Sequence, residues 1–149
     1  MNDAKDALAQ KILGIKRRKG FKWTELAAAI GMSPVFTAAA CMGQMSLEPT
    51  SAKKAASFLG LDEEEEAILC EAPYRGALPP GPPTDPTIYR FHELVQVYGP
   101  AWKALIHDEF GDGIMSAIDF DMSLTRMPDQ AGDRVKIEMT GKFLKYKRY

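Results

Sequence analysis

The sequence contains few of the residues that build disulfide frameworks or metal sites: its 149 residues include two cysteines and two histidines. Cys41 and Cys70 form no paired motif and neither has a histidine nearby in sequence, which excludes a zinc site and a disulfide scaffold and predicts buried free thiols. No apolar run approaches the roughly 18 residues of a membrane-spanning helix. The charged first residues also lack the apolar core of a signal peptide. The sequence therefore predicts a cytoplasmic protein with no membrane partner.

The chain also lacks an excess of charge of either sign. Its 19 basic and 20 acidic residues give a formal net charge of −1. Bulk electrostatic attraction to nucleic acid or to an anionic membrane needs a basic excess that this chain does not have. We therefore expect no nucleic-acid partner.

Proline is unevenly distributed along the chain. Six of the ten prolines fall within residues 73–86. Because proline fixes φ and donates no backbone hydrogen bond, this stretch is predicted to be an extended connector. It divides the sequence into two predicted domains, a helical domain over residues 1–77 and a domain over residues 78–149.

The first predicted domain has helical apolar spacing throughout. A helix over residues 3–19 ends in the basic cluster Lys16–Lys19 before Gly20, the usual arrangement at a helix C-terminus. Asp62, followed by four glutamates, is predicted to cap a further helix. We interpret both charge clusters as helix-end signals rather than as binding patches.

Residues 24–43 are predicted to form two helices joined by a turn at Gly31, with Ser33 and Pro34 starting the second helix. This order is similar to the helix-turn-helix of phage-repressor-like domains. A DNA-reading helix must present Arg, Lys, Asn or Gln to base edges. The second helix here offers one Thr and otherwise small or apolar side chains, so the motif predicts a fold without base-reading chemistry.

The second predicted domain mixes helices and strands, which makes the whole chain α+β. Asp85 or Thr84 should cap a helix closed by Gly99, and Pro100 should open a second helix. Residues 114–124 alternate with period 2, and residues 135–146 suggest a hairpin, about three short strands in all. Because a domain of this size has little hydrophobic core of its own, we expect the chain to oligomerise through this half.

Three polar side chains in this half are candidates for chemistry. Ser116 shares the parity of apolar residues on its strand, so its hydroxyl should be buried and must find a partner, normally a backbone group. Arg90 and Glu93 are three residues apart on a helix, which taken alone predicts an exposed ion pair. The Gly111–Ser116 run follows a helix and opens a strand, so it is not a dinucleotide-binding fingerprint.

Three separated runs in this half resemble the cyanase (cyanate hydratase) family. They are Pro83–Phe91 with Gln96–Gly99, Lys103–His107 with Phe110–Phe120, and Gly141–Leu144. The resemblance implies an enzyme that converts cyanate and bicarbonate into carbon dioxide and carbamate without a metal or organic cofactor. It also implies a decamer built from intertwined dimers, with active sites between subunits.

The resemblance assigns the catalytic roles to Arg90, Glu93 and Ser116 and puts Ile114 and Leu144 in the pocket wall. Our hypothesis adds the backbone from Gly113 through Met115 to Ser116 as an anion-binding nest. Two alternatives remain open: a helix-turn-helix DNA-binding regulator with a C-terminal oligomerisation or effector domain, and a non-catalytic assembly protein of the same fold.

Overall fold

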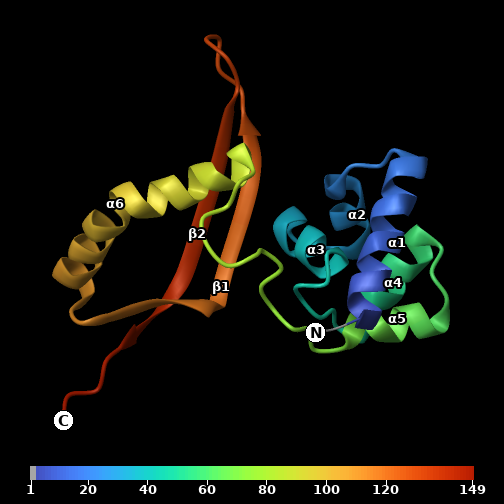
Figure 1. The fold of residues 1–149 in the computed structure, drawn as a ribbon, viewed down its shortest axis with the longest axis horizontal. Coiled ribbons are helices and arrows are strands. Elements are labelled where there is room, and N and C mark those ends of the chain that lie inside the picture. The colour runs from blue at the N-terminus through green and yellow to red at the C-terminus, as the bar shows by residue number, and fades with distance from the viewer. Residues whose placement is uncertain (1–2) are drawn as a thin grey trace. The chain divides into compact units, whose positions relative to one another are not determined.

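The protein is α+β, as the sequence predicts. The computed structural model describes residues 3–149 and contains six helices and two strands in that range. Figure 1 labels these elements, whose bounds are α1 Asp3–Lys19, α2 Trp23–Ile30, α3 Pro34–Cys41, α4 Pro49–Leu59, α5 Glu63–Cys70, α6 Pro86–Phe110, β1 Gly113–Met127 and β2 Arg134–Lys145. The chain forms two compact units. The first comprises the helices up to Ala77 together with Met122–Glu138, and the second comprises Leu78–Asp121 and Met139–Tyr149.

The first unit holds the hydrophobic core. Helices α1 to α5 contribute most of its buried apolar side chains, of which Ile12, Leu26 and Leu59 are the largest fully buried ones, and Phe21 and Leu47 join the core from the loops between helices. Full burial of such a side chain is worth roughly 1.5–3 kcal/mol. The amphipathic spacing in residues 3–19 therefore places its apolar stripe against the other helices, as predicted.

The basic cluster at the end of α1 has structural partners. Gly20 follows the helix with φ of 70°, and its N–H donates to the Lys16 carbonyl at 2.8 Å. The Lys19 ammonium donates to the Phe58 and Leu59 carbonyls at 3.3 and 3.5 Å, at the end of α4. Lysines near helix C-termini satisfy free carbonyls and oppose the negative end of the dipole. The helix-end interpretation of this cluster is confirmed.

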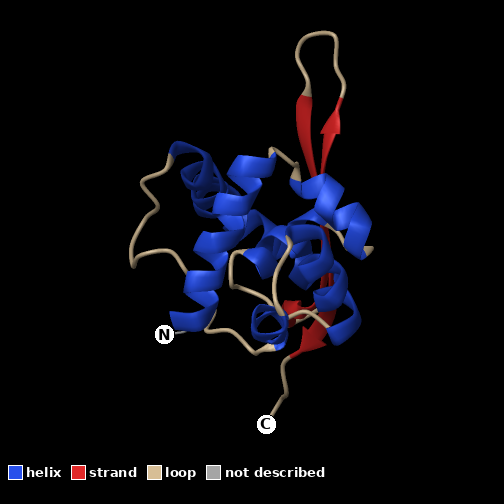
Figure 2. Ribbon diagram, turned by 90° about the vertical axis from the view of Figure 1, so that its right-hand side faces the viewer, coloured by secondary structure: helices blue, strands red, loops and turns tan. Residues whose placement is uncertain are grey.

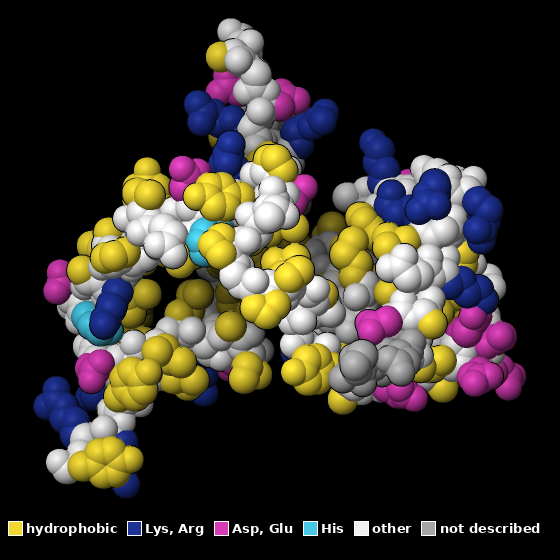
Figure 3. Space-filling model, in the orientation of Figure 1, with side chains coloured by type: hydrophobic (Ala, Val, Ile, Leu, Met, Phe, Trp, Pro, Cys, Tyr) yellow, Lys and Arg dark blue, Asp and Glu magenta, His cyan; other side chains and the backbone are white. Residues whose placement is uncertain are grey.

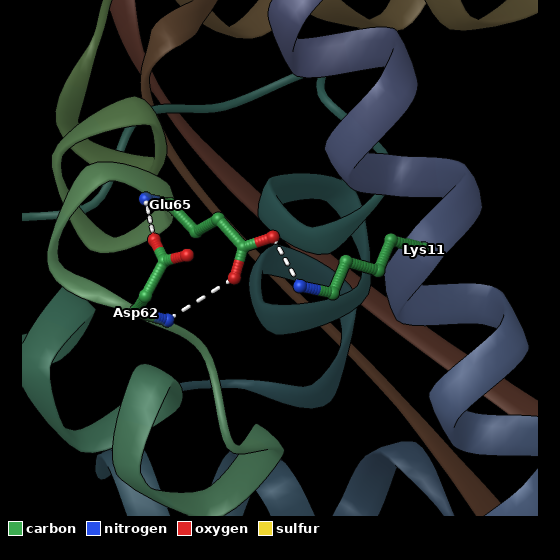
Figure 4. A network of polar contacts seen from close by, with 3 residues as sticks. All are labelled: Lys11, Asp62 and Glu65. Atoms are coloured by element: carbon green, nitrogen blue, oxygen red, sulfur yellow. Dashed lines mark hydrogen bonds and ion pairs between the residues drawn. The ribbon is translucent and has the colours of Figure 1, made fainter.

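The start of α5 is held by three side chains shown in Figure 4. Asp62 accepts from the Glu65 N–H at 2.9 Å, and the Glu65 carboxylate accepts from the Asp62 N–H at 3.1 Å. Lys11 of α1 forms an ion pair with the same Glu65 carboxylate. The predicted N-cap is therefore confirmed, and its reciprocal capping box is also linked to α1.

Helix α3 starts where the sequence predicts, with Ser33 at the N-cap position and Pro34 as the first helical residue. The Ser33 side chain, however, makes no capping hydrogen bond. Within the first unit its hydroxyl donates to the Met122 carbonyl at 3.0 Å. Ser33 therefore occupies the predicted N-cap position, but its hydroxyl is oriented toward the Met122 carbonyl and its oxygen accepts no hydrogen bond from the first turn of α3.

The second unit has one long helix where two were predicted. Asp85 caps α6 by accepting from the Thr87 and Ile88 N–H groups at 2.9 Å, and the helix runs for 25 residues with Pro100 inside it. A glycine that ends a helix usually adopts positive φ, and Gly99 is not among the glycines that do. Pro100 removes one helical hydrogen bond and favours a kink instead of a break.

The strands are also longer and fewer than predicted. β1 and β2 have 15 and 12 residues and form one two-stranded sheet, drawn in red in Figure 2. Gly113 lies against Leu144 and Ser116 against Gly141, so the strands run antiparallel. The two alternating runs expected around Gly141 form one strand, because Gly141 lies inside β2 without ending it.

The second unit buries almost nothing by itself. No residue of α6 is buried, and Ile118 of β1, one of the apolar residues that share the parity of Ser116, is 98% exposed. Figure 3 shows apolar side chains at the surface over this unit.

Among the described residues, no single helix is both long and apolar enough to span a membrane, and α2 with α3 would qualify only as a pair bent by 100°.

Candidate active site

Ser116 is the one polar side chain of the second unit that the described chain buries, at 4% exposure. Its Oγ accepts hydrogen bonds from the N–H groups of Ile118 and Asp119, both at 3.0 Å. The predicted burial and the predicted backbone partner are confirmed. Both contacts use the oxygen as acceptor, and none of the hydrogen bonds described for residues 3–149 uses the hydroxyl proton. Ser116 therefore keeps one donor for a bound group.

The start of β1, before Ser116, is tightly enclosed at Gly113. A Cβ atom on Gly113 would lie 2.4 Å from the Leu144 carbonyl oxygen and 2.5 Å from the Phe143 ring. Gly113 is buried, whereas Ile114, Met115 and Leu144 are 46%, 41% and 44% exposed. The predicted wall residues therefore lie at one end of the hairpin with their side chains accessible.

Arg90 and Glu93 lie in the first half of α6, and both are exposed. The Arg90 guanidinium carbon lies 6.0 Å from the centroid of the Tyr89 ring. The expected ion pair between Arg90 and Glu93 does not occur among the described residues, so that expectation is wrong for the single chain. Ordering two long exposed side chains costs about as much as such a pair returns.

The chain alone does not join these two residues to Ser116. None of the contacts described for residues 3–149 connects Arg90 or Glu93 with Ser116. The three candidate residues are thus separated into a helical pair and a strand hydroxyl.

A cavity of about 400 Å³ lies in the second unit beside the start of β1. Of the predicted site residues, Gly113, Ile114 and Met115 line it. Sequence reasoning missed its other lining residues, which are Gly99, Trp102, Lys103, Ile106, His107, Asp112 and Tyr146. The spacing of the helical members is the signal that was available, since residues three and four apart share one face of a helix.

The described residues contain no group of three or more His, Cys, Asp or Glu side chains placed to hold a metal ion. The two cysteines are free thiols, and Cys41 is buried whereas Cys70 is half-buried. Burial raises the pKa of the Cys41 thiol to about 12. Cys41 therefore stays protonated at neutral pH and is a poor nucleophile.

Comparison with known proteins covers nearly the whole chain. Residues 80–148 match the family described as the cyanate lyase C-terminal domain, and residues 5–73 match the N-terminal domain of cyanate hydratase. The chain is 54% identical over 142 residues to a cyanate hydratase of Methylibium petroleiphilum, covering 95% of this chain and 97% of that protein. It is also 54% identical over 138 residues to a cyanate hydratase of Cupriavidus necator, covering 93% and 94%.

The fold is shared with a solved structure as well. The crystal structure of cyanase from T. urticae matches with a TM-score of 0.82 at 34% sequence identity, covering 93% of this chain and 96% of that one. The resemblance carried by the three sequence runs is therefore confirmed, and with it the predicted enzyme class. The chain belongs to the cyanate hydratase family, also described as the cyanate lyase family.

Proposed function

We propose that the protein catalyses the bicarbonate-dependent decomposition of cyanate. The observation that carries the proposal is its 54% identity, over more than nine-tenths of the chain, to proteins named cyanate hydratase. The buried Ser116 hydroxyl, with its proton still available, supports the same conclusion because the reactants are small anions. The proposed reaction uses no metal and no organic cofactor, as the family resemblance implies, and bicarbonate is its second substrate.

The chemistry must first overcome repulsion between two anions. Two unit charges about 4 Å apart repel by roughly 4 kcal/mol at an effective dielectric of 20. The Arg90 guanidinium is permanently charged and planar, so it offsets this repulsion and orients trigonal oxyanions. Ser116 and the backbone N–H groups from Gly113 onward supply further hydrogen bonds to the bound anions.

In the proposed reaction, a bicarbonate oxygen attacks the cyanate carbon and forms a new C–O bond. The bond between this oxygen and the bicarbonate carbon then breaks, and the bicarbonate carbon leaves as carbon dioxide. Nitrogen receives the bicarbonate proton and one proton from solvent, which leaves carbamate. Carbamate takes up one more proton and separates into ammonia and a second carbon dioxide. In the proposed assembled site, Glu93 orients Arg90, a contact that the described residues of the single chain do not make, and assists the proton transfer to nitrogen. Correct placement of the two reactants is worth about 7–11 kcal/mol.

We also propose that the working form is a homo-oligomer, the dimer-based decamer implied by the resemblance. Large apolar side chains of α6 remain 40–63% exposed in the single chain, including Leu94, Val97 and Leu105. Contiguous exposed apolar surface of this kind is typical of an interface. The lack of contact between Ser116 and Arg90 or Glu93 among the described residues supports the same assembly, since a neighbouring copy would complete the site.

We further propose that helices α1 to α5 form a repressor-like bundle. We also propose that the protein works in the cytoplasm, where free thiols persist.

A DNA-binding regulator is not favoured by the structure of α3. Thr37 is the one hydroxyl-bearing side chain in this helix, and it is fully buried. The other side chains of α3 are apolar, with only a thiol besides, and offer nothing that reads a base edge. The helix therefore serves packing within the first unit.

The test of the proposed function is an ammonia assay on the purified protein. Cyanate with bicarbonate is expected to release ammonia, and removal of bicarbonate is expected to stop the release. An assembled protein that releases no ammonia but binds duplex DNA in a salt-sensitive way would instead be a regulator. An assembled protein that does neither would be a non-catalytic member of the fold.

A further inference from the structure

Gly141 of β2 lies directly against the backbone of Ser116. A Cβ atom at this position would lie 2.3 Å from the Ser116 carbonyl oxygen and 2.6 Å from Met115 Cγ. Gly141 is not among the glycines with positive φ, so its backbone conformation is open to any residue. Glycine is therefore required here for space and not for conformation.

The Ser116 side chain depends on where that backbone lies. Its Oγ is held between the N–H groups of Ile118 and Asp119, two and three residues further along the same strand. Such a local turn fixes the hydroxyl only while the Ser116 peptide keeps its position. An alanine at residue 141 would push the Ser116 carbonyl away by roughly 0.7 Å to reach the 3.0 Å that Cβ atoms normally keep.

We infer that Gly141 is a positioning residue for Ser116 in the proposed reaction. The missing side chain lets β2 hold the Ser116 peptide so that both acceptor positions of Oγ are filled by N–H groups and its proton is directed at the bound anion. This inference rests on the proposed function, because it assumes that Ser116 donates to a substrate. Displacement of a reacting group by about 1 Å costs on the order of 100-fold in rate.

The test is a double-mutant cycle with Gly141→Ala and Ser116→Ala, and with oxalate as a non-reacting dianion probe. Gly141→Ala is expected to weaken oxalate inhibition about tenfold and to lower kcat/KM about 100-fold, while the double variant is no worse than Ser116→Ala alone. Backbone amides of Ile118 and Asp119 are expected to exchange hydrogen faster in both single variants than in the wild type. Thr140→Ala, at the exposed neighbouring position of β2, is the matched control and should behave as the wild type.

Additive losses in the double variant would overturn the inference, because Gly141 would then act independently of Ser116. If sedimentation shows that Gly141→Ala does not assemble, the same substitution is made in a Met115→Ala background and compared with Met115→Ala alone. This background removes the clash of the new Cβ with the Met115 side chain and keeps its clash with the Ser116 carbonyl. Failure of that variant to assemble would also overturn the inference, because Gly141 would then serve strand pairing. If the wild type neither consumes cyanate nor binds oxalate, the proposed function fails, and amide exchange still shows whether Gly141 positions Ser116.

Discussion

Gly113 and Leu144 approach each other so closely that a Cβ atom on Gly113 would lie 2.4 Å from the Leu144 carbonyl oxygen. Gly113→Ala is therefore expected to force the two strands apart and to destabilise the protein by about 1–3 kcal/mol. Chemical unfolding followed by circular dichroism measures this loss.

Gly99→Ala is the matched control for that variant. A Cβ atom on Gly99 meets Val95 Cγ1 at 3.8 Å, an ordinary contact, and the residue lies inside α6. Alanine is better than glycine in a helix by up to about 1 kcal/mol, while the Pro100 ring disfavours a helical residue with a Cβ before it, so this variant should stay within about 1 kcal/mol of the wild type. Equal destabilisation of both variants would show that close strand contact is not the cause.

Ser116→Ala should lose activity and keep the assembly. The change removes the donor proposed for the substrate anion, and loss of one such donor typically costs about 100- to 1,000-fold in kcat. It also removes the acceptor of the Ile118 and Asp119 N–H groups, and because both residues are exposed and water can replace the acceptor, this costs only about 0.5–1.5 kcal/mol. Ammonia release and sedimentation are the measurements, with Ser123→Ala on the same strand as control. Near-normal rates would mean that the Ser116 hydroxyl only accepts hydrogen bonds from the backbone and does not bind substrate.

Arg90→Leu is expected to abolish both turnover and the binding of oxalate. The reason is that a guanidinium is the group proposed to offset repulsion between two bound anions. Arg126→Leu is the control, because Arg126 is an exposed arginine in a surface ion pair with Asp133 at 3.6 Å. Isothermal titration calorimetry measures the affinity of each variant for oxalate. Wild-type affinity in Arg90→Leu would show that Arg90 does not bind the anions.

The sequence predicts those features that depend on neighbours along the chain. Asp62 and Asp85 cap helices as expected, because an N-cap needs only its own residue and the next three. The predicted division of α6 into two helices was wrong, because a proline in a sequence usually indicates the end of a helix. The structure shows that the helix continues, since Gly99 does not adopt the positive φ of a helix-ending glycine. The close contact of Gly141 with Ser116 joins residues 25 apart in sequence, and no local pattern shows it. Arg90 and Ser116 make no direct contact among the described residues and lie on different elements, α6 and β1, so no local pattern fixes their geometry.

The capping box of α5 provides a stability prediction for the first unit. Asp62→Ala removes the acceptor for the Glu65 N–H and should cost about 0.5–2 kcal/mol. Glu64→Ala, at an exposed residue of the same first turn, should cost less, since a helix-dipole contact is worth about 0.3–1 kcal/mol. Urea unfolding of the two variants under identical conditions compares them. A larger loss from Glu64→Ala would contradict the role assigned to the cap.

Lys5 is a buried cation, and its titration should appear in the pH dependence of stability. The side chain is 2% exposed, and its ammonium donates to the Leu69 carbonyl at 3.3 Å. Burial lowers the pKa of Lys5 from its ordinary 10.5, nearby Glu71 and Cys70 oppose the shift, and Arg75 adds to it. Between the lowered pKa and 10.5 the unfolded chain holds a proton that the folded chain has released. The free energy of unfolding should therefore rise with pH across this window.

Lys5→Met should remove that rise and leave stability at neutral pH equal or higher, because methionine buries a similar length of chain without an ammonium group. The Leu69 carbonyl keeps a partner, since it also accepts from the Leu47 N–H at 2.9 Å. Urea unfolding from neutral pH to 10.5 measures the difference between wild type and variant, and Lys53→Met at an exposed lysine of α4 controls for the substitution itself. A difference that does not change with pH would show that Lys5 keeps its proton in the folded chain throughout this range.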